Sequence, residues 1–210
     1  LGNKILINEA GQIKFNGTEP LVSISEDDFS FYWERHAETY SNRGEITVAD
    51  RNKITPEGGL KSKKGAKSLI SVLKSELEED ADLVVIASPK ERTQETGQDF
   101  LDEVEVLTGR KFKLQIEDFL DEIYLGQLNE NTLQLINRDP AVFKFLAQFN
   151  RNMDATAEPP GDKSESYLKL LTRAYQGLEN FKSRMKARKL TNGGRKIIVV
   201  AFVHSIQATA

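Results

Sequence analysis

The apolar residues of the chain are grouped in a way that predicts alternating strands and helices. Continuous apolar runs at 83–87 and 197–203, rich in β-branched residues, are typical of strands buried on both faces of a parallel sheet. The aromatic run at 29–33 and the alternating pattern at 112–116 predict two more strands. Strands separated by helices indicate an α/β fold, with a mostly parallel central sheet in a three-layer α/β/α sandwich. Apolar residues at helical spacing predict helices over about 60–77, 89–107, 131–151 and 165–186.

The first 28 residues differ from the rest of the chain. Residues 4–15 alternate loosely between apolar and polar positions, which predicts a small hairpin or edge strands. At 210 residues, the chain is long enough for one ordinary domain with an extension. We therefore expect an N-terminal extension over 1–28, built as a short hairpin, and one domain over 29–210.

The ends of the helix at 89–107 are marked by residues with known terminal preferences. Ser88, Pro89 and Glu91 suit the cap, first and third positions of a capping box. Gly109 suits the position just after the last turn, where glycine adopts a left-handed backbone easily. The sequence thus predicts a capped helix that begins directly after a buried strand.

Composition narrows the classes of protein to which the chain belongs. Hydrophobic residues at 39% and charged residues at 29% are typical of a soluble globular protein. No apolar run approaches the ~20 residues of a membrane span, and the net charge of −3 argues against nucleic acid as a partner. The absence of cysteine excludes disulfides and thiolate nucleophiles, and two histidines offer little for a zinc site. We expect a cytoplasmic protein without a metal, a cofactor, or a membrane or nucleic-acid partner.

Both histidines follow a predicted strand. His36 comes shortly after the aromatic run at 29–33, and His204 directly follows the run at 197–203. Ligands of open α/β sheets bind beyond the carboxyl ends of the strands, so both imidazoles are expected at one edge of the sheet. His36 alone is interpreted as easily as a structural residue, and a histidine in the position of His204 is more often structural, so it is their pairing that indicates a site.

Arginines accompany the two histidines. Arg35 directly precedes His36, and Arg92 lies in the first turn of the helix at 89–107, whose N-terminus itself favours anions. The planar guanidinium group donates two parallel hydrogen bonds to phosphate and keeps its charge near neutral pH. Two arginines and two histidines around one point therefore predict a site that offsets the charge of a transferring phosphoryl group.

Short motifs occur in a fixed order over residues 29–210, and each alone is only a weak signal. The motifs are RHAETYSN at 35–42, ITPEG at 54–58, SPKERTQET at 88–96, LDEIYLG at 120–126, SES at 164–166 and VHS at 203–205. The ordered set is similar to the signature segments of the histidine phosphatase superfamily, the phosphoglycerate mutase-like branch 1. The resemblance implies a phosphoglycerate mutase-like α/β fold.

The resemblance also implies roles for individual residues. His36 would attack phosphorus in line and become phosphohistidine, and water would then hydrolyse it. Glu122 matches the position that protonates the leaving oxygen in many members, although it lies in an acidic cluster that also reads as a solvated loop. His204 would take part in catalysis as well as in binding. The residues expected to contact the phosphoryl oxygens are Arg35, Asn42, Arg92 and His204.

Two features depart from the family pattern. Ala37 replaces the glycine that usually follows the nucleophilic histidine, and we expect it to be tolerated, or else to narrow the pocket and reduce activity. The chain stops at Ala210, six residues after His204, whereas members usually continue, so the sequence is expected to be truncated or to end early. A C-terminal tail that would keep water from a phosphohistidine is not visible, which favours a phosphatase over a mutase.

Three functions are open at this point. The leading one is a metal-independent phosphatase acting on a small phosphorylated metabolite. The alternatives are a phosphoglycerate mutase or sugar-bisphosphate phosphatase, and, in another class, an inactive phosphate-binding or interaction module. Specificity is expected from the insert at about 123–163, whose residue types do not single out a substrate.

Overall fold

The structure is a computed structural model, and it describes residues 5–7, 13–15, 29–43, 53–124 and 164–204. The chain divides into two compact units. One is formed by Leu1–Ser23 and Ile123–Glu179, and the other by Ile24–Glu122 and Asn180–Ala210. The predicted boundary between residues 28 and 29 stays a prediction.

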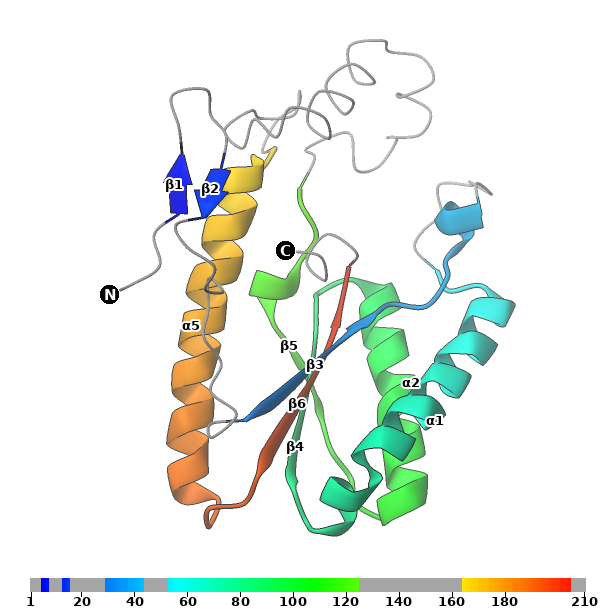
Figure 1. The fold of residues 1–210 in the computed structure, drawn as a ribbon. Coiled ribbons are helices and arrows are strands. Elements are labelled where there is room, and N and C mark those ends of the chain that lie inside the picture. Colours follow the sequence, from blue (N-terminus) through cyan, green and yellow to red (C-terminus); the bar gives the residue numbers. More distant parts are fainter. Residues whose placement is uncertain (1–4, 8–12, 16–28, 44–52, 125–163, 205–210) are drawn as a thin grey trace. The chain divides into compact units, whose positions relative to one another are not determined.

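The second unit contains a four-stranded sheet in which neighbouring strands are parallel, as Figure 1 shows. All four strands coincide with the apolar or alternating runs of the sequence, and the predicted parallel sheet is confirmed. Because neighbours in this order are far apart in sequence, helices connect them along the faces of the sheet. In sheet order the strands are β3 (Ser30–Arg35), β6 (Ile197–Val203), β4 (Asp82–Ala87) and β5 (Leu114–Ile116).

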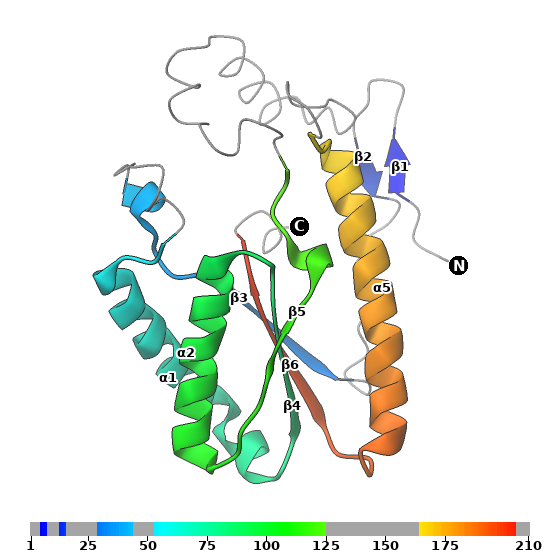
Figure 2. The ribbon, with the colours of Figure 1, turned by 180° about the vertical axis from the view of Figure 1, so that it is seen from behind.

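One face of this sheet is covered by α1 (Pro56–Glu78) and α2 (Glu91–Thr108), which lie side by side in Figure 2. Their apolar side chains form one core with alternate residues of the central strands. Fully burying each large side chain of this kind contributes about 1.5–3 kcal/mol to folding. The innermost members are Leu73, Leu77, Val85, Phe100, Val104, Ile198 and Val200.

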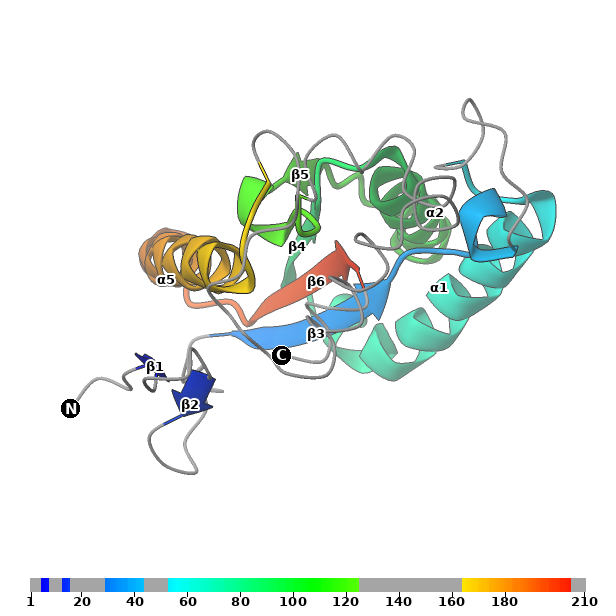
Figure 3. The same ribbon diagram turned by 90° about the horizontal axis from the view of Figure 1, so that it is seen from above.

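The opposite face packs against the last turns of α5 (Tyr167–Thr191), the part of that helix that belongs to the second unit. Phe181 is fully buried there, and its ring centroid lies 6.2 Å from that of Phe29 and 6.3 Å from that of Phe31. Helices therefore cover both faces, which confirms the predicted three-layer arrangement within this unit (Figure 3).

Two helix starts differ from the prediction. Helix α1 begins at Pro56, before the predicted 60, because the Thr55 hydroxyl oxygen caps it and accepts the N–H of Gly58 at 2.9 Å. Helix α2 begins at Glu91, without a side-chain cap, so the predicted capping box is wrong. Ser88 Oγ is engaged instead with Thr93 Oγ1 at 2.9 Å and with His204 Nε2 at 2.8 Å.

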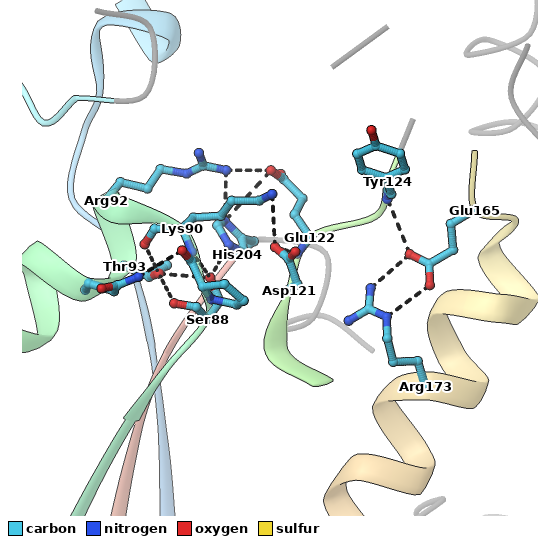
Figure 4. Close-up of polar contacts among 12 residues, drawn as sticks. Ser88, Lys90, Arg92, Thr93, Asp121, Glu122, Tyr124, Glu165, Arg173 and His204 are labelled. Carbon is cyan, nitrogen blue, oxygen red and sulfur yellow. Dashed lines mark hydrogen bonds and ion pairs between the residues drawn. The ribbon is translucent and has the colours of Figure 1, made fainter. Parts of the chain in front are cut away.

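The described part of the first unit holds a small hairpin and the beginning of α5. Strands β1 (Ile5–Ile7) and β2 (Ile13–Phe15) pair antiparallel. Before α5, the Glu165 carboxylate accepts the Tyr124 N–H at 3.3 Å and two hydrogen bonds from Arg173, at 3.0 and 2.9 Å (Figure 4). The predicted helix at 131–151 and nearly all of the insert at 123–163 lie outside the described residues.

The described helices include none that is long and apolar enough to cross a bilayer.

Candidate active site

The two histidines lie beside each other at the carboxyl edge of the sheet. Strands β3 and β6 pair with Arg35 opposite Val203, so His36 and His204 are the next residues on neighbouring strands. The backbone N–H of His36 donates to the backbone carbonyl of Val203 at 3.1 Å, and the two imidazole centroids are 5.2 Å apart. The structure thus brings together the two residues that the sequence placed at one sheet edge.

His36 is held in a single tautomer. Its Nδ1 lies 2.7 Å from the carbonyl oxygen of Ala37, and because a carbonyl only accepts, Nδ1 carries the proton and Nε2 keeps its lone pair. Burial lowers the pKa of His36 to about 4; the hydrogen bond to Ala37 opposes this shift, and the charges of Arg92 and Arg35 add to it. At neutral pH the ring is therefore uncharged, with Nε2 available as a nucleophile.

His204 is fully buried and has the opposite tautomer. The guanidinium of Arg92 donates to Nδ1 at 3.2 Å, so Nε2 carries the proton and donates to Ser88 Oγ at 2.8 Å. Burial lowers the pKa of His204 to about 2, and the nearby positive charge of Arg92 contributes next. This ring is therefore neutral too, fixed between one donor and one acceptor.

Arg92 reaches the histidines from the first turn of α2 and is itself only 7% exposed. Its Nη2 lies 2.5 Å from Glu122 Oε2, and that oxygen is 4.0 Å from His204 Nδ1 (Figure 4). A second pair runs alongside, with Lys90 Nζ 3.3 Å from Asp121 Oδ1. The predicted phosphate-binding arginine, the predicted acid and the second histidine therefore form one contact group.

Thr96 is a part of the site to which the sequence analysis gave no role. Its hydroxyl accepts the N–H of Ala37 at 3.0 Å and donates to the carbonyl of Arg92 at 2.7 Å. The sequence does contain a pattern that indicates Thr96: it lies four residues after Arg92 in the SPKERTQET motif, so the two side chains share one helix face. Thr96 thereby ties the segment after His36 to α2.

The contacts of this group that are described above do not include Arg35 or Asn42. Arg35 ends β3 with an exposed side chain, and it acts on both histidines through its charge, which lowers their pKa values. Asn42 lies in a 3₁₀ turn, η1 (Tyr40–Arg43), where its Oδ1 accepts from the backbone N–H and the hydroxyl of Thr39, both at 3.0 Å. The phosphate contacts of Arg35 and Asn42 stay predictions.

Ala37 does not need the backbone freedom of the glycine that it replaces. Among the described non-glycine residues, only Asp80 has a positive φ, so Ala37 adopts a backbone that any residue tolerates. No three His, Asp or Glu side chains within the described ranges are arranged to hold a metal ion. The chemistry that this site offers is a neutral imidazole nucleophile beside a buried guanidinium and a carboxyl group.

The fold is shared with solved phosphatases and a mutase. A Bacillus anthracis phosphoglycerate mutase is 19% identical, with a TM-score of 0.53 over 88% of this chain and 80% of that chain. A phosphoserine phosphatase from Entamoeba histolytica, in complex with 3-phosphoglyceric acid, is 20% identical, with a TM-score of 0.53 over 85% and 76%. A mycobacterial glucosyl-3-phosphoglycerate phosphatase, in complex with VO3, is 17% identical, with a TM-score of 0.51 over 82% and 74%.

The search of curated proteins found no match. The sequence profile of the histidine phosphatase superfamily (branch 1) matches residues 31–210, the part of the chain that carries both histidines, Arg92 and Glu122. The match covers well over half of the chain, and the sheet agrees with the phosphoglycerate mutase-like fold. The chain belongs to the histidine phosphatase superfamily.

Proposed function

We propose that this protein is a metal-independent phosphatase that hydrolyses a small phosphomonoester through a phosphohistidine at His36. The observation that carries the proposal is the contact between His36 Nδ1 and the Ala37 carbonyl, because it leaves Nε2 unprotonated and fixes the direction of its lone pair. The lowered pKa of His36 keeps this nitrogen free of a proton at neutral pH.

In the first step, Nε2 of His36 attacks phosphorus while the bond to the leaving oxygen breaks. Arg92 and Arg35 offset the negative charge on the phosphoryl oxygens, as positioned guanidinium groups do in phosphoryl transfer. Glu122, in its protonated form, donates its proton to the leaving oxygen, since an alkoxide leaves poorly without one.

In the second step, water replaces the leaving alcohol on the same side of the phosphohistidine. The Glu122 carboxylate takes one proton from this water as its oxygen attacks phosphorus. The bond between phosphorus and Nε2 breaks, the imidazole regains its lone pair, and inorganic phosphate is released. Glu122 ends the cycle protonated, as it began.

Turnover of an aryl phosphate, measured with and without a chelator, tests the proposal. We expect hydrolysis in both conditions, and loss of it in His36→Gln, a variant with a side chain of similar size and no basic nitrogen. Arg184→Gln serves as the matched control, because Arg184 is exposed and pairs with Glu117. Equal rates in wild type and His36→Gln would refute the proposal.

Trapping the intermediate separates the competing functions. A phosphatase gives an acid-labile phosphoenzyme that is absent in His36→Gln, and it releases phosphate. A mutase gives the same phosphoenzyme but isomerises a phosphoglycerate when primed with a bisphosphate. An inactive binding module binds phosphate or vanadate and forms no phosphoenzyme.

A further inference from the structure

The Glu122 carboxylate lies against the guanidinium group that is assigned to the substrate's phosphoryl group. Arg92 Nη2 contacts Glu122 Oε2 at 2.5 Å and His204 Nδ1 at 3.2 Å (Figure 4). A carboxylate and a phosphoryl group each present two anionic oxygens, which the guanidinium fork binds in the same way. Glu122 therefore makes the contact that the proposed mechanism asks of the substrate.

We infer that Glu122 and the phosphoryl group compete for Arg92, and that phosphoryl binding drives a proton onto Glu122. This inference rests on the proposed function, because it takes the phosphoryl group to bind at Arg92. It adds a coupling between two events that the mechanism treats separately. Binding of the anion thus causes Glu122 to take up the proton that the leaving oxygen needs.

The two partners differ in their freedom to move. The Arg92 side chain is 9% exposed and is anchored on the first turn of α2, whereas the Glu122 side chain is 37% exposed. Glu122 follows a 3₁₀ turn, η2 (Asp118–Leu120), in an extended segment that belongs to no helix or strand. When a second anion reaches Arg92, the carboxylate is the group that yields.

The charges around Glu122 determine whether its carboxylate is protonated when the anion binds to Arg92. Arg92 is the cation in contact with it, and His204, 4.0 Å away, is neutral because burial holds its pKa near 2. Two other described cations lie near the site: Lys90, which pairs with Asp121 at 3.3 Å, and Arg35, which ends β3 with an exposed side chain. A phosphoryl dianion that takes the place of the carboxylate on Arg92 thus brings two anions beside one buried guanidinium group, and two neighbouring anions favour protonation of one of them.

The histidines are the other groups that can take up this proton. His204 Nδ1 accepts from Arg92, and His36 Nε2 carries a lone pair, so each ring has one basic nitrogen facing the site. Both are buried, and burial opposes a charged imidazole. Glu122 differs from them because protonation removes a negative charge beside the bound dianion and creates no buried positive charge.

Sulfate binding, followed by calorimetry at pH 7 in two buffers with different ionisation enthalpies, measures this coupling. Sulfate is a dianion that neither titrates near neutral pH nor transfers a phosphoryl group, so proton uptake reports the protein alone. We expect wild type to take up a proton, up to about one per bound sulfate. Glu122→Gln should take up none, and it should bind sulfate about two- to fivefold more tightly, the range expected when a partly exposed ion pair is removed.

Asp121→Asn is the matched control, since it removes the neighbouring carboxylate, which pairs with Lys90. Its proton uptake should equal that of wild type. Proton uptake that persists in Glu122→Gln would assign the proton to a histidine and overturn the inference, and so would weaker sulfate binding by that variant or no sulfate binding by wild type. Sulfate coupling without aryl phosphate turnover would instead count against the proposed function alone.

Discussion

The Nδ1 proton of His36 points at the carbonyl oxygen of Ala37, the next residue in the chain, at 2.7 Å. The acceptor is part of the backbone and cannot lose its role by titration, so the tautomer is fixed over the whole working pH range. A nucleophile held in this way needs only to be unprotonated at Nε2. The pH at which it gains a proton there therefore sets the acid limit of activity.

That limit is expected well below the usual range of histidine, because burial lowers the pKa of His36 to about 4. The value of kcat/KM, corrected for the second ionisation of the phosphate ester at about pH 6, should show no decline from pH 7 down to about pH 5. A pH series with aryl phosphate checks this, using only the folded fraction measured by circular dichroism. An acid limb centred near 6.5 would show that His36 titrates as an ordinary exposed histidine.

Acid should destabilise the fold through the same two histidines. Their folded pKa values, about 4 for His36 and about 2 for His204, lie below the ordinary 6.5 of the unfolded chain. The unfolded state therefore binds more protons as the pH falls below about 6.5, and stability declines from there towards pH 4. The expected slope is about 1.4 kcal/mol per pH unit and per histidine.

Urea unfolding at pH 6.5 and pH 5 measures this decline. We expect the free energy of unfolding to fall by about 3 kcal/mol, and His204→Gln to remove about half of the pH dependence. A variant whose pH dependence equals that of wild type would mean that His204 is protonated in the folded state as readily as in the unfolded chain.

Thr96 should matter for both activity and stability. Thr96→Val removes the acceptor of the Ala37 N–H while keeping the shape of the side chain, so a partly buried donor loses its partner. We expect a loss of about 1–3 kcal/mol in unfolding free energy and a kcat about tenfold lower, because the segment after the nucleophile shifts. Thr191→Val, at the exposed end of α5, is the control and should leave kcat unchanged.

Replacement of Ala37 by glycine should have only small effects on stability and activity. Because Ala37 does not have a positive φ, Ala37→Gly should not relieve strain. Glycine adds conformational freedom to the unfolded chain, so stability should drop by about 0.4–1 kcal/mol while kcat stays within about twofold of wild type. A large gain in kcat, measured with the same aryl phosphate, would show instead that the extra methyl group narrows the pocket.

The sheet could be predicted from the sequence because each strand is marked by a short pattern of neighbouring residues. The β-branched runs at 83–87 and 197–203 are typical of strands buried on both faces of a parallel sheet, and both are central strands in the structure. The positions of His36 and His204 follow from the same runs, because carboxyl ends of parallel strands meet at one edge.

The contacts inside the site depend on distant residues and could not be predicted in this way. Ser88 has every local feature of a helix cap, yet its hydroxyl meets His204, 116 positions later in the chain. The pairing of Arg92 with Glu122 joins residues 30 positions apart. The preference of serine for the N-cap position is weak compared with a hydrogen bond to a buried imidazole. Ser88 therefore bonds to His204 and does not cap α2.

The far edge of the sheet offers a test in which stability and activity separate. Asp82 opens β4, at the end opposite His36, and is 5% exposed. Its carboxylate accepts two hydrogen bonds from Arg188, both at 2.7 Å, and one from Asn192 at 3.1 Å. The hydrogen bond from Arg188 is the main reason that the pKa of Asp82 lies below its usual value.

Asp82→Asn should therefore lower the free energy of unfolding by about 1–3 kcal/mol, less than for a fully buried pair because Arg188 is partly exposed. The stabilisation by this pair is fully present above the ordinary carboxyl pKa and is lost as the pH falls through the lowered pKa of Asp82. The variant should therefore lose that acid sensitivity.

Asp80→Asn is the control. Asp80 is 64% exposed and has a φ of 64°, which asparagine tolerates, so the change in unfolding free energy should stay within about 0.5 kcal/mol. Specific activity of the folded fraction should match wild type in both variants. A kcat that falls with Asp82→Asn would show that this edge of the sheet is coupled to His36 after all.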